Sequence, residues 1–261
     1  MNEAIIDVNV YLSRWPFRRL PNDEPAALVD KLRSQGVVQA WAGSLDAILH
    51  RDLGAVNRRL AADCRAAGEG FLLPFGAVNP RLPDWEEDLR RCHEEHGMPG
   101  IRLHPNYHGY QPDDPLVPKL LAAAAERKLI VQIAVTMEDE RTQHPLVQVP
   151  HVNLAPLAKV VESTPGLRLV LLNAFRSLRP EVRDQLVAAG EVYFEIATLE
   201  GIGGVGTLAG QIDGKRILFG SYAPVFYFEA ALLKLQESEL GQMQLNSIRE
   251  TNAQRLLAGA N

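Results

Sequence analysis

The chain has 261 residues, of which 46% are hydrophobic and 23% are charged, with a net charge of −5. These values exclude a disordered chain and leave no basic surface that would attract nucleic acid. No apolar run approaches the ~20 residues that cross a bilayer, so we expect neither a membrane nor a nucleic-acid partner. The length suits a single domain over residues 1–261, because α/β barrels typically have about 250 residues.

Cysteine content and the first residues bear on the cellular compartment. Cys64 and Cys92 are the two cysteines of the chain, too few for a disulfide framework and not spaced as a CxxC pair. The opening residues, Met1–Ala4, lack the basic segment of a secretory signal peptide. We therefore expect a cytoplasmic protein with reduced thiols.

Short apolar or alternating runs, typical of strands, recur along the chain. They are Ala4–Leu12, Val37–Gly43, Leu72–Val78, Gly100–Pro105, Leu129–Val135, Leu167–Ala174, Val192–Leu199 and Ile217–Pro224. Helical patterns lie between and after them, at Pro25–Gln35, Arg51–Ala67, Pro83–His96, Pro115–Lys128, Asn153–Ser163, Pro180–Ala189, Gly206–Gln211, Phe226–Glu239 and Gln242–Ala258. Strands that alternate with helices predict a parallel sheet, and this number of units predicts a closed (β/α)8 TIM barrel.

The first strand is polar on one side and apolar on the other. Asp7, Asn9 and Tyr11 alternate with Val8 and Val10. In a barrel the polar residues would face the interior, near the carboxyl end of the strands where barrel enzymes keep their chemistry. We therefore expect the two valines to face the surrounding helices.

The same alternation assigns faces in the later strands. In the fourth strand, IRLHP, it turns Arg102 and His104 inward. In the sixth strand, Asn173 shares a face with Leu169 and Leu171. The predicted polar interior consists of Asp7, Asn9, Tyr11, Arg102, His104, Gln132, Asn173, Glu195 and Tyr222.

Charge inside a barrel needs a partner. We expect Arg102 to form an ion pair with Glu195 or Asp7. The alternative is that its planar guanidinium faces a ligand, where it would suit a carboxylate.

Several segments together resemble the amidohydrolase superfamily, in particular the amidohydrolase-related (amidohydrolase 2) branch that includes metal-dependent decarboxylases and lactonases. IIDVNVYL stands where that family's first strand reads I-D-x-H-x-H, and ILFGSYAP stands where its last strand reads I-L-F-G-S-D-x-P. GIRLHPNYHGY, LIVQIAV, LVLLNAF and IRETNAQRLL resemble its fourth, fifth and sixth strands and its C-terminal helix. The resemblance extends over nearly the whole chain and implies a TIM barrel of amidohydrolase type.

The resemblance also implies a divalent metal, held by histidines of the first, fifth and sixth strands and by an aspartate of the last strand that serves as general base. At the matching positions this chain has Asn9, Tyr11, Ala134, Asn173 and Tyr222. None of them supplies imidazole, carboxylate or thiolate, the donors that such metals need. A phenol with a pKa of about 10 does not replace the aspartate base. We therefore expect the family's fold with the metal-ligand positions substituted and no cofactor.

Two further features leave alternatives open. Zinc could be held in a rebuilt site around His104 and His144, with an acid such as Glu138. The stretch Met137–His144, after the fifth strand, is either a lid that supplies a general base or a solvated loop that caps a short helical turn.

The leading hypothesis is metal-free binding of a polar, carboxylated small molecule at the carboxyl ends of the strands. The predicted substrate-binding residues are Asn9, Tyr11, Arg102, Gln132, His144 and Asn173, and the predicted catalytic residues are His104, Glu195 and Tyr222. If the protein is an enzyme, the resemblance implies a hydrolase or a carbon–carbon lyase.

Two other functions compete with this one. The first is a metal-dependent hydrolase or decarboxylase with the rebuilt site. The second is a non-catalytic scaffold or regulatory barrel, which Trp15 and Phe17 exposed on a flat patch would favour. A homo-oligomer is expected only by analogy with barrels of this type.

Overall fold

The computed structural model describes residues 4–68 and 70–259. Eight parallel strands form one sheet in the order β1 to β8, so each strand pairs with the next along the chain. The strands are β1 (Ile5–Leu12), β2 (Val37–Ser44), β3 (Leu72–Ala77), β4 (Gly100–Leu103), β5 (Ile130–Ala134), β6 (Arg168–Leu172), β7 (Glu191–Glu195) and β8 (Ile217–Leu218). The N–H groups of Val8 and Tyr11 donate to Phe219 and Ala223, each at 2.9 Å. These bonds join β1 to the chain that continues β8, and the sheet closes into the predicted (β/α)8 barrel.

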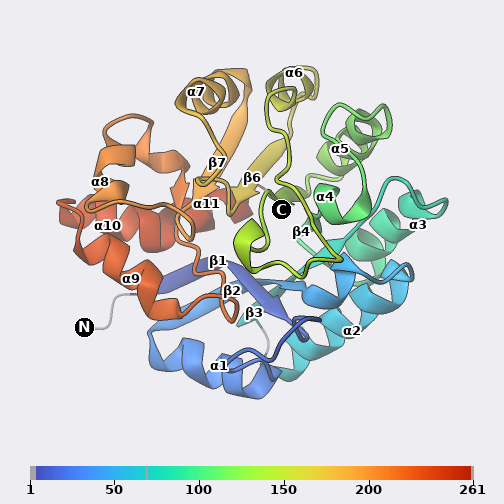
Figure 1. Cartoon of the computed structure of the whole chain (residues 1–261), viewed down its shortest axis with the longest axis horizontal. Coiled ribbons are helices and arrows are strands. Elements are labelled where there is room, and N and C mark those ends of the chain that lie inside the picture. Colours follow the sequence, from blue (N-terminus) through green and yellow to red (C-terminus); the bar gives the residue numbers. More distant parts are fainter. Residues whose placement is uncertain (1–3, 69, 260–261) are drawn as a thin grey trace.

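Helices surround the strands on the outside (Figure 1), and the last helix also packs Ala253 and Leu256 into the apolar cluster inside the barrel. They are α1 (Pro25–Ser34), α2 (Leu53–Ala66), α3 (Trp85–Arg90), α4 (Pro105–His108), α5 (Leu116–Glu126), α6 (Leu157–Glu162), α7 (Pro180–Ala189), α8 (Gly204–Ala209), α9 (Phe228–Gln236), α10 (Gln242–Asn246) and α11 (Asn252–Ala258). The short helix α4 was not predicted. The helix predicted from Pro83 to His96 ends at Arg90 and continues as a π-helical turn, Arg91–Glu95.

Apolar side chains fill the space between strands and helices and also the amino-terminal half of the barrel. Val170 and Leu172 belong to the inner cluster, whereas Leu169 and Leu171 belong to the outer one. The prediction that Leu169 and Leu171 face the barrel interior is therefore wrong. Asn173 comes directly after Leu172, yet its side chain also lies inside, because its backbone adopts a left-handed conformation with φ of 54°.

The first strand departs from strict alternation in a similar way. The register of β1 against β2 shifts between Asp7 and Val10. Val8 consequently joins the inner apolar cluster, contrary to the prediction, while Val10 joins the outer one as expected. Such an irregularity also turns the Val8 carbonyl into the barrel, where it accepts a hydrogen bond from Gln132 at 2.9 Å.

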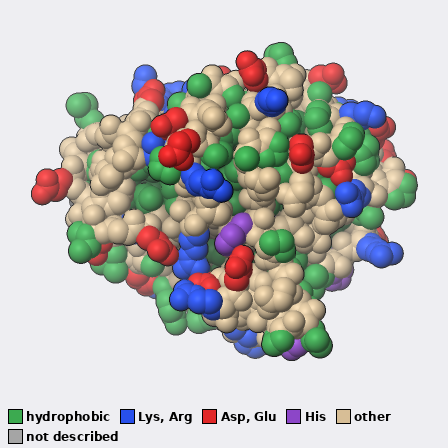
Figure 2. Space-filling model, turned by 45° about the horizontal axis from the view of Figure 1, so that its top comes forward, with side chains coloured by type: hydrophobic (Ala, Val, Ile, Leu, Met, Phe, Trp, Pro, Cys, Tyr) green, Lys and Arg blue, Asp and Glu red, His purple; other side chains and the backbone are tan. Residues whose placement is uncertain are grey.

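The surface carries charges of both signs. Figure 2 shows basic and acidic side chains interspersed over one face, without a large area of a single sign. Within the described residues, we find no helix with the length and apolar character needed to cross a membrane.

Candidate ligand site at the carboxyl end of the barrel

The polar residues predicted for the interior lie inside the barrel. Each is at most 1% exposed. They are Asp7, Asn9, Tyr11, Arg102, His104, Gln132, Asn173, Glu195 and Tyr222. His144, which was predicted to bind substrate, instead lies exposed in the loop after β5, where its Nδ1 accepts a hydrogen bond from the N–H of Leu146 at 3.2 Å.

Asn9 and Asn173 form an amide–amide pair between β1 and the end of β6. Asn9 Nδ2 donates to Asn173 Oδ1 at 2.9 Å, and both side chains are fully buried. Asn tolerates the left-handed backbone at position 173 better than most residues do. Asn9 Oδ1 and Asn173 Nδ2 have no hydrogen-bond partner among the described residues. Buried polar atoms without a partner are uncommon, so this pair is a candidate for contact with a further molecule.

Two tyrosines and a histidine line the same mouth. The hydroxyl of Tyr11 lies 3.1 Å from His104 Nε2, and the rings of Tyr11 and Tyr222 meet edge to face at 5.7 Å. His104 Nδ1 has no partner among the described residues. Burial lowers the pKa of His104 well below its ordinary value and raises the pKa of Tyr222 well above its own. Both side chains are therefore neutral at neutral pH, so the Tyr222 phenol keeps its proton.

The segment between β5 and α6 covers this mouth. Figure 1 shows it in yellow-green, crossing in front of the centre of the barrel. Met137, which is 2% exposed, has its Sδ 3.6 Å from the hydroxyls of both Tyr11 and Tyr222. The Met137 carbonyl accepts a hydrogen bond from Tyr222 at 2.5 Å. Met137 therefore occupies the hydrogen-bonding ends of both phenols.

Ion pairs attach this segment to neighbouring loops. Arg18, after β1, lies 2.7 Å from Glu138, and Arg176, after β6, lies 3.1 Å from Asp139. Burial raises the pKa of Glu138, whose carboxylate is engaged by Arg18. The segment thus lies over the mouth, where a lid would lie, and it also forms the predicted helical turn. Asp139 accepts the N–H of Arg141 at 2.9 Å at the start of the turn Glu140–Thr142. The contribution of Met137 was missed, because one methionine in a charged stretch makes no pattern.

Arg102 is buried, and no carboxylate of the described residues forms an ion pair with it. Its Nε donates to Gln132 Oε1 at 2.8 Å, and its terminal nitrogens donate to the carbonyls of Val10 and Trp41 at 2.8 and 3.0 Å. The ring of Tyr11 covers the guanidinium at 4.3 Å. The predicted ion pair with Asp7 or Glu195 is wrong, because backbone carbonyls turned into the barrel take its place. Arg102 and Gln132 therefore hydrogen-bond β4 and β5 to carbonyls of β1 and β2.

Asp7 and Glu195 hold the strand ends through backbone donors. Asp7 accepts the N–H of Ser221 at 3.0 Å, and Glu195 accepts those of Asn173 and Ala197 at 2.5 and 2.6 Å. Burial raises the pKa of Asp7 to about 6 and that of Glu195 to about 7. These carboxylates position the loops that carry Asn173 and Tyr222, the residue after Ser221.

The residues at this mouth do not fit the divalent metal of the resemblance. The matching positions supply amides, phenols and the methyl group of Ala134, which are not the donors such ions need. In residues 4–68 and 70–259, no three His, Cys, Asp or Glu side chains come together to hold an ion. The rebuilt site around His104 and His144 is therefore not formed.

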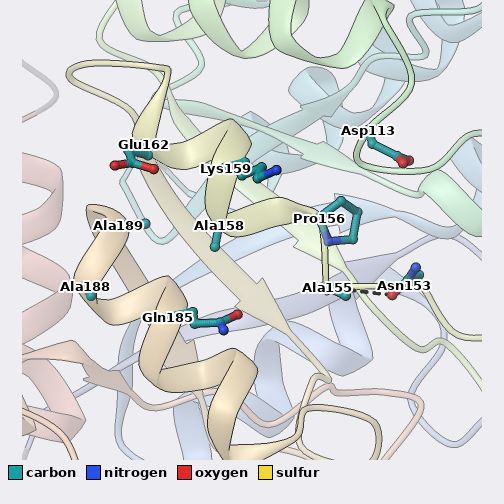
Figure 3. Close-up of a pocket in the computed structure, with 10 residues that line it drawn as sticks. All are labelled: Asp113, Asn153, Ala155, Pro156, Ala158, Lys159, Glu162, Gln185, Ala188 and Ala189. Carbon is teal, nitrogen blue, oxygen red and sulfur yellow. Dashed lines mark hydrogen bonds between the residues drawn. The ribbon is translucent and has the colours of Figure 1, made fainter.

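The largest cavity described lies elsewhere. It has a volume of about 690 Å³ and lies between α6 and α7, outside the barrel (Figure 3). Lys159 and Glu162 of α6 and Gln185 of α7 line it together with small apolar residues. None of the predicted site residues takes part.

The surface expected of a scaffold is formed only in part. Phe17 is 40% exposed, but Trp15 is only 2% exposed and belongs to the apolar cluster around Met137. The two residues therefore do not make a flat exposed patch.

These features define a (β/α)8 barrel with a buried, hydrogen-bonding site at the carboxyl end of its strands. The sequence matches the profile of the amidohydrolase family over residues 11–258, and the chain belongs to this family. No curated protein sequence matches it significantly.

Solved structures share the fold at low sequence identity. An uncharacterized TIM-barrel protein from Bordetella bronchiseptica superimposes with a TM-score of 0.73 and 16% identity, covering 98% of this chain and 99% of that one. A 2,6-dihydroxybenzoate decarboxylase from Rhizobium gives 0.69 and 15%, covering 98% of both chains. A dihydroxybenzoic acid decarboxylase from Polaromonas sp. JS666, with bound manganese and the inhibitor 2-nitroresorcinol, gives 0.76 and 14%, covering 98% of this chain and 97% of that one. At these identities the similarities show the fold alone.

Proposed function

We propose that this protein binds a polar, carboxylated small molecule at the carboxyl end of the barrel, without a metal ion. The observation that carries the proposal is that three buried polar atoms at this mouth, Asn9 Oδ1, Asn173 Nδ2 and His104 Nδ1, have no hydrogen-bond partner in the described part of the chain. A barrel that served only as a scaffold would gain more stability from apolar side chains at these positions. The structural neighbours add support, since one is described in complex with 2,6-dihydroxybenzoate.

The carboxylate of the ligand is assigned to the two phenols. When Met137 moves aside, the hydroxyl of Tyr222 becomes a free donor in a largely apolar surrounding. The hydroxyl of Tyr11 becomes a second free donor in the tautomer in which His104 Nε2 donates to it. Hydrogen bonds to an ionised acceptor are stronger than neutral ones, so two phenols suit a carboxylate. The buried charge of Arg102, behind the ring of Tyr11, favours an anion there without touching it.

Proton transfer is assigned to His104. Its imidazole is neutral and can donate or accept a proton, depending on its tautomer. In a metal-free site this group, together with positioning of the ligand, supports hydrolysis or carbon–carbon cleavage. Glu195 is assigned a positioning role, because both of its oxygens accept backbone N–H groups.

Calorimetric titration with benzoate, 2-hydroxybenzoate and 2,6-dihydroxybenzoate tests the proposal, with the protein in EDTA and again with added zinc or manganese. We expect binding in EDTA that is unchanged by metal and weakened about tenfold by Tyr222→Phe, which removes one of the two hydroxyls assigned to the carboxylate. Lys159→Ala, in the cavity outside the barrel, is the matched control and should leave the affinity unchanged. Binding that requires a metal, or elemental analysis showing about one metal ion per chain after purification without affinity metal, would refute the proposal.

A further inference from the structure

The Asn9–Asn173 pair offers a hydrogen-bonding pattern that does not depend on how the two amides are turned. As described, Asn9 Nδ2 donates to Asn173 Oδ1, which leaves the oxygen of Asn9 and the nitrogen of Asn173 free of partners among the described residues. If both amides are rotated by half a turn, Asn173 donates to Asn9, and again one donor and one acceptor remain. The reason is that each amide has one oxygen that accepts and one nitrogen that donates, so a single bond between the two amides always leaves one oxygen and one nitrogen with no bond at all, and the bonded nitrogen keeps its second hydrogen.

We infer that this pair recognises a molecular edge on which one donor and one acceptor lie side by side, as in a neutral carboxamide, lactam or urea. A carboxylate presents acceptors only, so one of its oxygens would oppose the free amide oxygen. An amidinium presents donors only and would oppose the free amide nitrogen. Because the site is fully buried, either mismatch leaves polar atoms unsatisfied, which corresponds to discrimination of roughly tenfold to hundredfold.

The inference deepens the proposed function and rests on it, since the carboxylate of the ligand is assigned to the hydroxyls of Tyr11 and Tyr222. Both groups of atoms belong to one mouth. Asn9 and Tyr11 lie two residues apart on β1, and the N–H of Tyr222 donates to the carbonyl of Asn9 at 2.8 Å. The ligand is therefore a carboxylate that also carries a neutral amide-like group.

Three matched probes separate the two ends of such a ligand. 3-Carbamoylbenzoate, isophthalate and 3-amidinobenzoate share the ring and one carboxylate, and they differ only in the second group. By calorimetry on the wild-type protein in EDTA, we expect the carbamoyl compound to bind roughly tenfold or more tightly than the other two. The para isomers are measured alongside, to allow for the distance between the two ends.

Asn173→Asp changes the pattern in a defined way. An aspartate only accepts, so Asn9 must turn its nitrogen toward it, and two acceptors remain. We expect the preference to move from the carbamoyl to the amidino probe. Aspartate also tolerates the left-handed backbone found at this position. Asn9→Asp also leaves two free acceptors, because Asn173 must then donate to the aspartate. This variant tests the same change of preference if Asn173→Asp does not fold. Tyr222→Phe is the matched control and should weaken all three probes by a similar factor.

Each outcome decides something. Reversal of the preference in either aspartate variant supports the inference. Similar affinities for the three probes, unchanged by the aspartate variants, would overturn it while the proposed function stands, and would mean that water completes the amide pair. If no probe binds the wild type or Met137→Ala, in which the covering side chain is removed, both the inference and the proposed function are overturned.

Discussion

Replacing Arg102 with methionine tests how this barrel tolerates an arginine that has no carboxylate partner. The guanidinium makes three short hydrogen bonds, at 2.8 to 3.0 Å, to Gln132 Oε1 and to the carbonyls of Val10 and Trp41. Methionine keeps much of the apolar stem but leaves three buried acceptors without their donor.

The size of the effect follows from two opposing contributions. Each acceptor left unsatisfied costs about 1–3 kcal/mol. Removing the buried charge recovers several kcal/mol of desolvation. We expect Arg102→Met to lower the free energy of unfolding by about 3 kcal/mol, which in a chain of this length lowers Tm by about 6–12 °C.

Urea unfolding followed by circular dichroism measures this loss, and two variants sharpen it. A Cβ at Gly43 would lie 2.7 Å from Arg102 Nη1, so Gly43→Ala displaces the guanidinium and should destabilise the protein in the same direction. Arg19, whose side chain is 65% exposed and pairs with Asp23, is the control. Arg19→Met should change the free energy of unfolding by less than about 1 kcal/mol. If Arg102→Met is as stable as the wild type, the bonds of Arg102 only offset its desolvation and the reasoning is refuted.

Three further predictions concern the carboxylate and the lid. The pKa of Glu195 is raised to about 7 in the folded protein. Its protonated carboxyl therefore contributes fully to the free energy of unfolding below the pKa that Glu195 has in the unfolded chain, and this contribution is lost as the pH rises through about 7. The unfolding free energy of the wild type minus that of Glu195→Gln should therefore fall between pH 4.5 and pH 8, by on the order of 3 kcal/mol; a flat difference would contradict the raised pKa. Arg18→Ala removes the ion pair with Glu138. It should speed amide hydrogen exchange in residues 137–150 while Tm changes little. Arg141→Ala, at an exposed side chain of the same segment, is the control and should leave this exchange unchanged. Met137→Ala should lower the free energy of unfolding by about 2–5 kcal/mol, measured in urea, because it leaves a cavity among the residues of the mouth.

The barrel and most of its interior could be predicted from the sequence, because a period of two assigns faces wherever a strand is regular. It did so for Arg102 in β4 and for His104 directly after that strand. It failed at Val8, where β1 shifts register, and in β6, where the left-handed residue Asn173 reverses the alternation. Neither irregularity changes the composition of the strand, so neither is visible in the pattern of apolar residues.

The partners of the site residues were harder to predict than their burial. The rule that buried charge is paired suggested an acid for Arg102, whereas the structure supplies the carbonyls of Val10 and Trp41. The contact between Tyr11 and Met137 joins residues 126 positions apart, and no local pattern encodes it. The position of the segment after β5, at the mouth, could be predicted from the sequence. That Met137 is the side chain that fills the mouth could not.

The hydrogen bonds among the residues at the substituted metal-ligand positions bear on whether the mouth binds a ligand. Asn9 and Asn173, which stand where the resemblance places two histidine ligands, bond to each other and still leave one donor and one acceptor. The hydroxyl of Tyr222, in place of the aspartate, donates to the Met137 carbonyl of the covering segment. If only the fold mattered, apolar residues would fill the mouth and stabilise the barrel more, because burying them carries no desolvation penalty for polar groups. Hydrogen-bonding groups that are buried, incompletely paired and covered by a segment attached through ion pairs are what a site needs if it closes over its ligand.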